Sequence, residues 1–183
     1  MDYYINIKLN PDDEMRANVL MNKVYTKLHK VLFDSTAADI GVSFPQWKVK
    51  LGRVLRIHGT VNSLATLEQA NWLGGLAGYC NVSEVTPVPD NCQHRTINRK
   101  QSTMTQAKLN RLLKRGSITV EEVQEYKAKM FTKGLDNPYL ELQSGSNGHK
   151  HRRYIEFGEL QTKPIAGQFD QFGLSKTATI PWF

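Results

Sequence analysis

The first 90 residues carry a hydrophobic pattern that predicts the order strand, helix, strand, strand, helix, strand. Alternating polar and apolar side chains over residues 3–9 predict a half-buried strand, and residues 40–44, 54–58 and 79–88 predict three more. This order is that of the split βαβ, or ferredoxin-like, unit. The fold hosts many functions and indicates none of them, although many RNA-binding proteins use its open four-stranded sheet.

Two helices are expected between these strands. The first is predicted to begin with Asn10 as its N-cap and Pro11 in its first position, and to end near Phe33. Its apolar residues recur at helical spacing, at Leu20, Val24, Leu28 and Val31. The second helix is predicted over residues 63–76.

Composition changes after Pro87 and Pro89, which predicts two domains, residues 1–90 and residues 91–183. The second half is expected to contain a basic strand, a basic helix, a helix over 119–133, strands over 139–143, 150–156 and 160–162, and a C-terminal stretch. The predicted fold class is therefore α+β. An N-terminal ferredoxin-like (βαββαβ) domain is followed by a smaller α+β domain that carries the basic helix.

Positive charge is concentrated between Asn91 and Val120. The chain has 24 basic and 17 acidic residues, a net charge of +7. This one segment holds seven cations and no carboxylate: Arg95, Arg99, Lys100, Lys108, Arg111, Lys114 and Arg115. Such a concentration is typical of a site for a polyanion, and a solvated basic helix is the alternative.

Within the basic segment, Lys108, Arg111 and Arg115 fall on one narrow arc of the predicted helix, whereas Leu109, Leu112 and Leu113 are expected to point elsewhere and pack. Upstream, Arg99 and Gln101 are two residues apart in an extended segment and so project to the same side. Arginine can bridge the acceptors of guanine, and glutamine can pair with adenine. The alternative is that both are ordinary exposed side chains.

A histidine and a small-residue loop are the candidates for chemistry. His29 lies near the end of the first helix, where it is either a surface residue or a group that transfers protons. The loop SGSNG, with Ser144 and Ser146, either brings backbone N–H groups to a phosphate or forms a hairpin turn. A basic run that includes His151 and Arg152 follows it at once.

The sequence gives little support for a metal site or for a membrane-spanning segment. The sequence has no HExxH motif, no calcium loop and no carboxylate cluster near the basic segments, so neither a metal nor another cofactor is expected. A histidine, small hydroxyls and cations suit RNA, because its 2′-OH can attack the adjacent phosphate once a base takes the proton. The absence of a long apolar run or signal-peptide pattern predicts a cytoplasmic protein without a membrane partner. Cys80 and Cys92 are expected to be reduced.

Motifs along nearly the whole chain resemble those of the CRISPR repeat-processing endoribonucleases of subtype I-F, the Csy-type within the RAMP superfamily. These motifs are MDYYINIKLNPD, KLHK around His29, IGVSFP, LGRVLRIH, RTINRKQ, the basic helix, SGSNG, QFGLSK and PWF. The resemblance implies binding of one CRISPR repeat hairpin and one metal-independent cut at the 3′ base of its stem. The expected ends are a 5′-hydroxyl and a 2′,3′-cyclic phosphate. The enzyme would stay on the crRNA beside other subunits of the surveillance complex.

The resemblance also assigns roles to residues. His29 matches the catalytic histidine, and Ser144 the serine that positions the nucleotide. Arg99 and Gln101 match the pair that recognises nucleotides at the base of the stem. The family has an arginine-rich helix that lies in the major groove of the RNA stem. The residues that match this helix are Lys108, Arg111, Lys114 and Arg115.

Four positions depart from the family pattern. Phe172 replaces a tyrosine before GLSK, so the role of that hydroxyl is absent. His151 replaces a phenylalanine that stacks under the terminal base pair, and its imidazole could stack there or transfer a proton. Asn110 and Leu112 replace further arginines, which predicts weaker binding. A non-catalytic subunit that only binds the hairpin, and a ribosomal-type protein that binds RNA through charge alone, remain the competing hypotheses.

Overall fold

The computed structural model describes residues 1–101, 105–132, 136–143 and 148–183. Its first sheet is antiparallel and has the strand order β2-β3-β1-β4. The members of this sheet are β1 (Tyr3–Leu9), β2 (Gly41–Ser43), β3 (Val54–Gly59), β4 (Cys80–Val82) and β5 (Thr86–Pro87), which also pairs with β1. The sheet order and the intervening helices confirm the predicted ferredoxin-like unit within an α+β fold.

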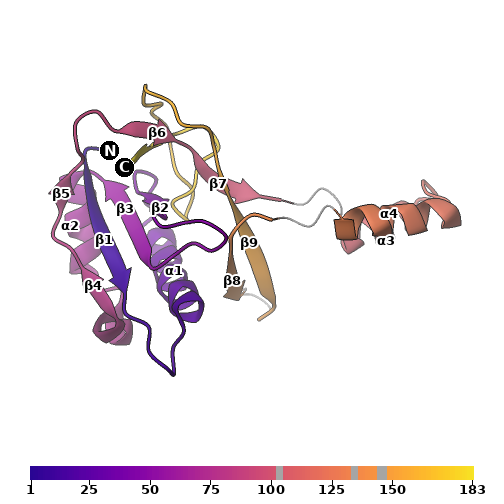
Figure 1. Cartoon of the computed structure of the whole chain (residues 1–183), viewed down its shortest axis with the longest axis horizontal. Helices are drawn as coiled ribbons and strands as arrows, with labels where there is room; N and C mark the ends of the chain where they lie inside the picture. The colour runs from indigo at the N-terminus through magenta and orange to yellow at the C-terminus, as the bar shows by residue number, and fades with distance from the viewer. Residues whose placement is uncertain (102–104, 133–135, 144–147) are drawn as a thin grey trace.

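Helices α1 (Ala17–Asp34) and α2 (Val61–Gln69) lie on one face of this sheet (Figure 1). Alternate residues of β1 are buried beneath them, namely Ile5, Ile7 and Leu9. Leu20, Val24 and Leu28 of α1 fill the space above the sheet and are equally inaccessible. Burial of these apolar side chains is the main force that holds helix and sheet together.

The predicted start of α1 is wrong by several residues. Oδ1 of Asp12 accepts the backbone N–H groups of Glu14 and Met15, which forms a turn in place of the first helical turn. Arg16, in an extended conformation, therefore becomes the N-cap. Asn10 and Pro11 lie outside the helix.

The predicted bounds of α2 and of the last strand of the first sheet are also corrected. Thr60 caps α2: its hydroxyl accepts the N–H of Ser63, whose own hydroxyl accepts the N–H of Thr60. The helix ends at Gln69, and a separate 3-10 helix, η1 (Gly74–Tyr79), follows. The strand predicted over residues 79–88 is divided into β4 and β5.

Two further sheets form the second half of the chain. One is antiparallel with the order β7-β9-β8, and the other pairs β10 with β6. The strands are β6 (Gln93–Arg95), β7 (Ile97–Lys100), β8 (Tyr139–Gln143), β9 (Lys150–Phe157) and β10 (Ile180–Trp182). No strand forms over the predicted residues 160–162, where Gln161 makes only an isolated bridge to His94.

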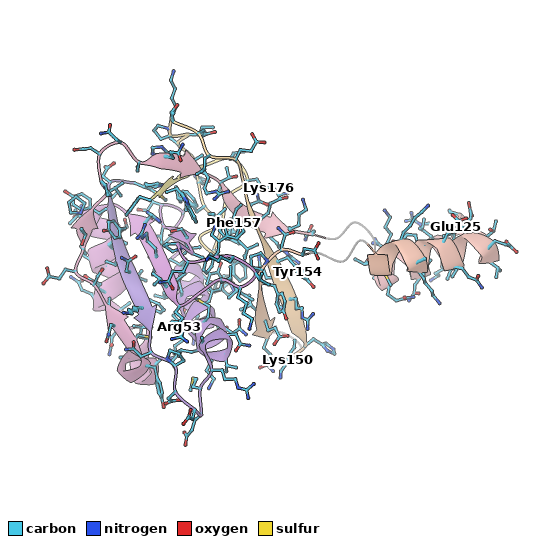
Figure 2. All side chains as sticks on the ribbon, viewed as in Figure 1. Arg53, Glu125, Lys150, Tyr154, Phe157 and Lys176 are labelled. Atoms are coloured by element: carbon cyan, nitrogen blue, oxygen red, sulfur yellow. The ribbon has the colours of Figure 1, made fainter. Side chains whose placement is uncertain are left out.

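The two halves share a buried core. Ile97, Leu140 and Ile155 of the second half belong to the same cluster of buried apolar side chains as the first sheet. Figure 2 shows Phe157 in the region between β9 and the first sheet, where its ring stacks on Trp47 with 4.0 Å between centroids. On α1, Oδ1 of Asn22 accepts the backbone N–H of Glu141 on the edge strand β8. The division into domains at residue 90 stays a prediction.

Helices α3 (Gln106–Lys114) and α4 (Val120–Thr132) lie apart from the sheets (Figure 1). The hydroxyl of Tyr126 on α4 lies 3.2 Å from the backbone nitrogen of Thr105, the N-cap of α3. Leu109 is fully buried, as expected, but Leu113 is 44% exposed. The prediction that Leu113 packs is wrong, because this helix pair is too small to cover every leucine.

Two expectations drawn from composition can be compared with the described residues. Cys80 and Cys92 are both free cysteines, the first buried and the second half-buried. No helix in the described part of the chain is long and apolar enough to cross a membrane.

Candidate active site

His29 lies on α1, half-buried, with its ring fixed by a distant backbone group. Its Nδ1 is 2.9 Å from the carbonyl oxygen of Gln171. A carbonyl oxygen can only accept a hydrogen bond, so Nδ1 carries the proton in this contact. In the neutral imidazole, Nε2 therefore keeps its lone pair and can accept a proton from another molecule.

Phe172 separates His29 from a cation. Its ring is stacked on the imidazole with 3.6 Å between centroids and 12° between planes. The guanidinium carbon of Arg153 is 3.5 Å from the centroid of the same ring. Both groups are too close to the centroid to share one face of the ring. The three side chains thus form a sandwich, with Phe172 in the middle.

The segment that carries Gln171 and Phe172 is held as a tight turn. Oδ1 of Asp170 accepts the backbone N–H groups of Phe172 and Leu174, each at 2.9 Å. Gly173 has a φ of +68°, and a Cβ at this position would lie 2.8 Å from a methyl group of Val42. Only glycine satisfies both conditions without strain, so the turn presents the Gln171 carbonyl and the Phe172 ring together.

A hydrogen bond from Tyr25 holds this turn against α1. Its hydroxyl donates a 2.7 Å hydrogen bond to the carbonyl oxygen of Phe172. Burial raises the pKa of Tyr25 well above its usual range, so the phenol stays protonated and remains a donor. Tyr25 is one helical turn before His29, and therefore the same helix positions both His29 and its stacking partner.

Arg153 supplies a buried positive charge behind the sandwich. Its side chain is 7% exposed, and its Nε has no hydrogen-bond partner among the described residues. Burial is the largest influence and lowers the pKa of the guanidinium, and the charge of Arg99 lowers this pKa further, whereas Tyr25 and Asp170 oppose the change. Arginine nevertheless stays charged, because its ordinary pKa lies far above neutrality.

The register of the β7-β9-β8 sheet places several predicted residues on one face. Arg99 of β7 lies opposite Ile155, and His151 of β9 lies opposite Leu142. Side chains of paired residues point to the same side of a sheet, so Arg99, His151 and Arg153 share the face that is turned towards His29. Arg99 is exposed and His151 half-buried.

Other predicted residues lie elsewhere. Arg152 points to the opposite face of β9, where it pairs with Glu141 and lies 4.5 Å from the centroid of the Tyr139 ring. Gln101 is exposed directly after β7, and its projection to the same side as Arg99 stays a prediction. Ser144 and Ser146 lie outside the described residues. Figure 2 shows Lys150 at the end of β9 and Glu125 far from it, on α4.

The basic residues of α3 are exposed on the helix pair that lies apart from the sheets. Lys108, Arg111 and Lys114 are on the helix, and Arg115 is its C-cap. None of the four forms an ion pair with another residue in the described ranges. Their charges are therefore available to a polyanion.

A second histidine is buried on the other face of the first sheet. Nε2 of His58 is 2.8 Å from the hydroxyl of Ser43, and burial is the main reason that its pKa is lowered to about 3. The ring is fully inaccessible. His58 therefore cannot reach a substrate, and His29 is the better candidate for a base.

Arg153, Tyr25 and Asp170 were not identified from the sequence. A signal was present for Arg153, since it is two residues before Ile155 in the predicted strand and should share the inward side of that residue. No comparable signal marked Tyr25 or Asp170, because their roles depend on a contact between α1 and a turn near the other end of the chain.

The arrangement combines a proton acceptor with positive charge. Nε2 of His29 can take a proton from a hydroxyl group, and the exposed guanidinium of Arg99 can stabilise a nearby anionic oxygen. The described part of the chain contains no group of three or more His, Cys, Asp or Glu side chains that could hold a metal ion.

Comparison with known proteins gives consistent results over the whole chain. Residues 4–183 match the family described as CRISPR-associated protein (Cas_Csy4). The chain is 40% identical over 184 residues to a CRISPR-associated endonuclease Cas6/Csy4 of Escherichia coli (strain UTI89 / UPEC). It is 35% identical over 187 residues to a protein of the same name from Pseudomonas aeruginosa (strain UCBPP-PA14). Each alignment covers 100% of both proteins.

Proposed function

The chain belongs to the Cas_Csy4 family of CRISPR-associated proteins, and from this premise we propose that it is an endoribonuclease that processes CRISPR RNA. It binds the repeat hairpin in the precursor transcript and cuts once, at the 3′ base of the stem. Both relatives named above are called endonucleases, which supports this class of reaction. The substrate is the repeat hairpin within precursor crRNA, and the product is mature crRNA.

The observation that carries the proposal is the orientation of His29. The Gln171 carbonyl holds the proton on Nδ1 and leaves the lone pair on Nε2. Stacking on Phe172 fixes the plane of the ring, so Nε2 has a defined direction. A base that must remove a proton from one hydroxyl group needs both conditions.

The proposed reaction uses neither water as the nucleophile nor a metal. Nε2 of His29 takes the proton from the 2′-OH of the nucleotide before the cut, and the 2′-oxygen attacks the adjacent phosphorus. The bond from phosphorus to the 5′-oxygen of the next nucleotide breaks, and that oxygen takes a proton from the solvent, to which His29 afterwards releases the proton that it took. The products are a 2′,3′-cyclic phosphate and a 5′-hydroxyl. Nearby cations stabilise the negative charge on the phosphate oxygens, and Ser144 helps to position the nucleotide.

Phe172 replaces the family tyrosine without loss of its ring. The proposed contribution of this position is the aromatic face, because the carbon ring alone makes the contacts with His29 and Arg153. A hydroxyl group is not needed for either contact. Arg153 acts from the far side of the ring by keeping Phe172 against the imidazole.

RNA binding is assigned to exposed cations. The phosphates of the stem are contacted by Lys108, Arg111, Lys114 and Arg115, a role supported by their exposure and by their lack of ion pairs with any described residue. Arg99 and Gln101 recognise nucleotides at the base of the stem. The protein then stays on the crRNA in the cytoplasm, beside the other subunits of the surveillance complex.

One gel tests this function. The protein is incubated in EDTA with its cognate repeat RNA, and with the same RNA carrying a 2′-deoxy sugar before the cut. A single cut that ends in a 2′,3′-cyclic phosphate, in the ribose substrate alone, is the expected result. Cutting of the deoxy RNA, or a requirement for magnesium, would contradict the mechanism. Tight binding without any cut would instead support a non-catalytic hairpin-binding subunit.

A further inference from the structure

Phe33 is an aromatic side chain that the fold leaves in solvent. It lies one helical turn after His29 on α1 and is 59% exposed. Its ring meets the imidazole at 63°, with 6.3 Å between centroids. Phe172 covers a face of the His29 ring, whereas Phe33 stands beside it on the outer surface of the helix. A single exposed apolar residue is ordinary, but one beside the proposed base is in reach of the reacting RNA.

Three lysines continue the surface that Phe33 begins. Lys23, Lys27 and Lys30 are exposed and occur at helical spacing, so they share one side of α1. Lys30 is three residues before Phe33 and adjoins it. None of the three lysines forms an ion pair within the part of the chain that the structure describes. We call Phe33 with these three lysines the α1 face.

The charge of the α1 face is not neutralised by its own helix. Asp34, at the last position, is the only acidic residue in α1. Phe33 and Lys23 are ten positions apart, or about 15 Å along the axis. A row of cations that begins with an exposed aromatic ring is the combination that proteins use to bind single-stranded nucleic acid: bases stack on the ring and phosphates follow the charges.

The position of this surface fits one part of the proposed substrate. Cutting at the 3′ base of a stem leaves paired RNA before the cut and an unpaired strand after it. The residues assigned to the stem lie on β7 and α3, and Arg99 shares the sheet face turned towards His29. The α1 face begins with Phe33, beside His29, and extends along α1, which is a different element.

We propose that the α1 face binds the single-stranded RNA that continues 3′ of the cut. Phe33 stacks on a base close to the scissile phosphate, and Lys30, Lys27 and Lys23 contact the phosphates that follow. Stacking and charge are tolerant of sequence, so the site accepts any flanking strand. This inference rests on the proposed function, because the cut defines where the unpaired strand begins.

The test uses two uncleavable RNAs with the same repeat hairpin and a 2′-deoxy sugar before the cut. One RNA ends directly after the scissile phosphate, and the other continues for several unpaired nucleotides. Affinities for both are measured by fluorescence anisotropy. The wild-type protein is expected to bind the longer RNA more tightly. Phe33→Ala removes one stacked base and should reduce that gain by roughly fivefold or more, the lower end of the range for one base–aromatic stack. It should bind the short RNA normally.

Two conservative variants separate stacking from simple apolar contact. Phe33→Tyr keeps a planar ring and should keep the gain, whereas Phe33→Leu should lose it as Phe33→Ala does. The lysines are tested by the salt dependence of binding to the longer RNA. Lys27→Gln with Lys30→Gln should make the slope shallower by about 0.7 for each lost phosphate contact. Lys8→Gln is the matched control, because Lys8 is exposed on the sheet face opposite α1.

Several results would overturn the proposal. Equal wild-type affinity for the two RNAs would show that the flanking strand is not bound. Retention of the gain by Phe33→Leu would exclude base stacking and show that a simple apolar contact with the RNA is sufficient. Equal weakening of both RNAs by Phe33→Ala would assign Phe33 to the hairpin. Cleavage of the unmodified longer RNA is measured in parallel: normal cutting without the gain rejects only the α1 face, whereas failure to cut rejects the proposed function.

Discussion

The imidazole of His29 and the ring of Phe172 lie face to face, 3.6 Å apart at their centroids. The residue before Phe172 also accepts the hydrogen bond from Nδ1 of His29. One turn thus sets both the plane and the tautomer of the proposed base. That turn is fixed from three sides, by Asp170, by Tyr25 and by the close approach of Gly173 to Val42. The orientation of His29 is therefore a property of the rigid turn and not of α1 alone.

His29→Ala should abolish cleavage and leave hairpin binding nearly unchanged, because the ring moves a proton and does not hold the RNA. Proton transfer typically contributes 10²–10⁴-fold to a rate. Single-turnover cleavage and anisotropy measure the two effects. His94→Gln is a control for the loss of a histidine. A variant that keeps more than a tenth of the wild-type rate would remove His29 from the mechanism.

Phe172→Leu should slow cleavage by roughly 10- to 100-fold with little change in KM. Without the stacked ring, the imidazole of His29 is no longer held in the direction needed to take the proton from the 2′-OH. Phe172→Tyr preserves the ring face and should cut at a rate close to that of the wild type. Melting curves show whether the leucine variant is folded. If the tyrosine variant were much faster than the wild type, the hydroxyl would have a chemical role that the ring does not supply.

Arg111→Ala and Arg115→Ala should weaken hairpins of any stem sequence about equally. Each should make the salt slope shallower by roughly one unit for each lost phosphate contact. Arg99→Ala should instead cost ~1–3 kcal/mol and relax the preference at the base of the stem. Affinities for a panel of stems at several salt concentrations test this division. It would be reversed if the helix variants changed base preference and Arg99→Ala did not.

His151→Phe should preserve or improve hairpin binding and keep the cut site, because base stacking on an aromatic platform contributes ~1–3 kcal/mol. His151→Ala should weaken binding or make the cut less uniform. The position of His151 beside Arg153 on the inner face of β9 makes contact with the stem end possible. Normal binding by His151→Phe, with cleavage lost as in His29→Ala, would show that His151 transfers a proton.

His58 should make the protein less stable in mild acid. Burial lowers its pKa to about 3 in the folded state, whereas the unfolded chain binds a proton near pH 6.5. Between these values the unfolded state holds more protons, so stability falls as the pH falls. From pH 6.5 to pH 5 the loss is about 2 kcal/mol. Urea unfolding at both pH values should show a smaller loss in His58→Phe, and an equal loss would contradict the assignment.

Local pattern was sufficient for much of the fold. Residues 3–9 and 139–143 form strands with the predicted bounds, because period-2 alternation reflects a half-buried strand wherever it packs. The start of α1 was missed because Asp12 satisfies the backbone of Glu14 and Met15 in a turn that propensity does not distinguish from a helix N-terminus.

His29 and the basic segment could be chosen as candidates from the sequence alone, since a histidine and a run of cations are recognisable without a fold, and their roles stay predictions. Arg153 and Phe172 acquired their places only through tertiary structure. Phe172 lies more than 140 positions after His29, and the hydrogen bond of Tyr25 to its carbonyl oxygen spans 147. No periodicity encodes contacts at that separation. They arise because α1, β9 and the 170–174 turn bury their apolar sides against one core, which brings a cation, an aromatic ring and an imidazole within stacking distance.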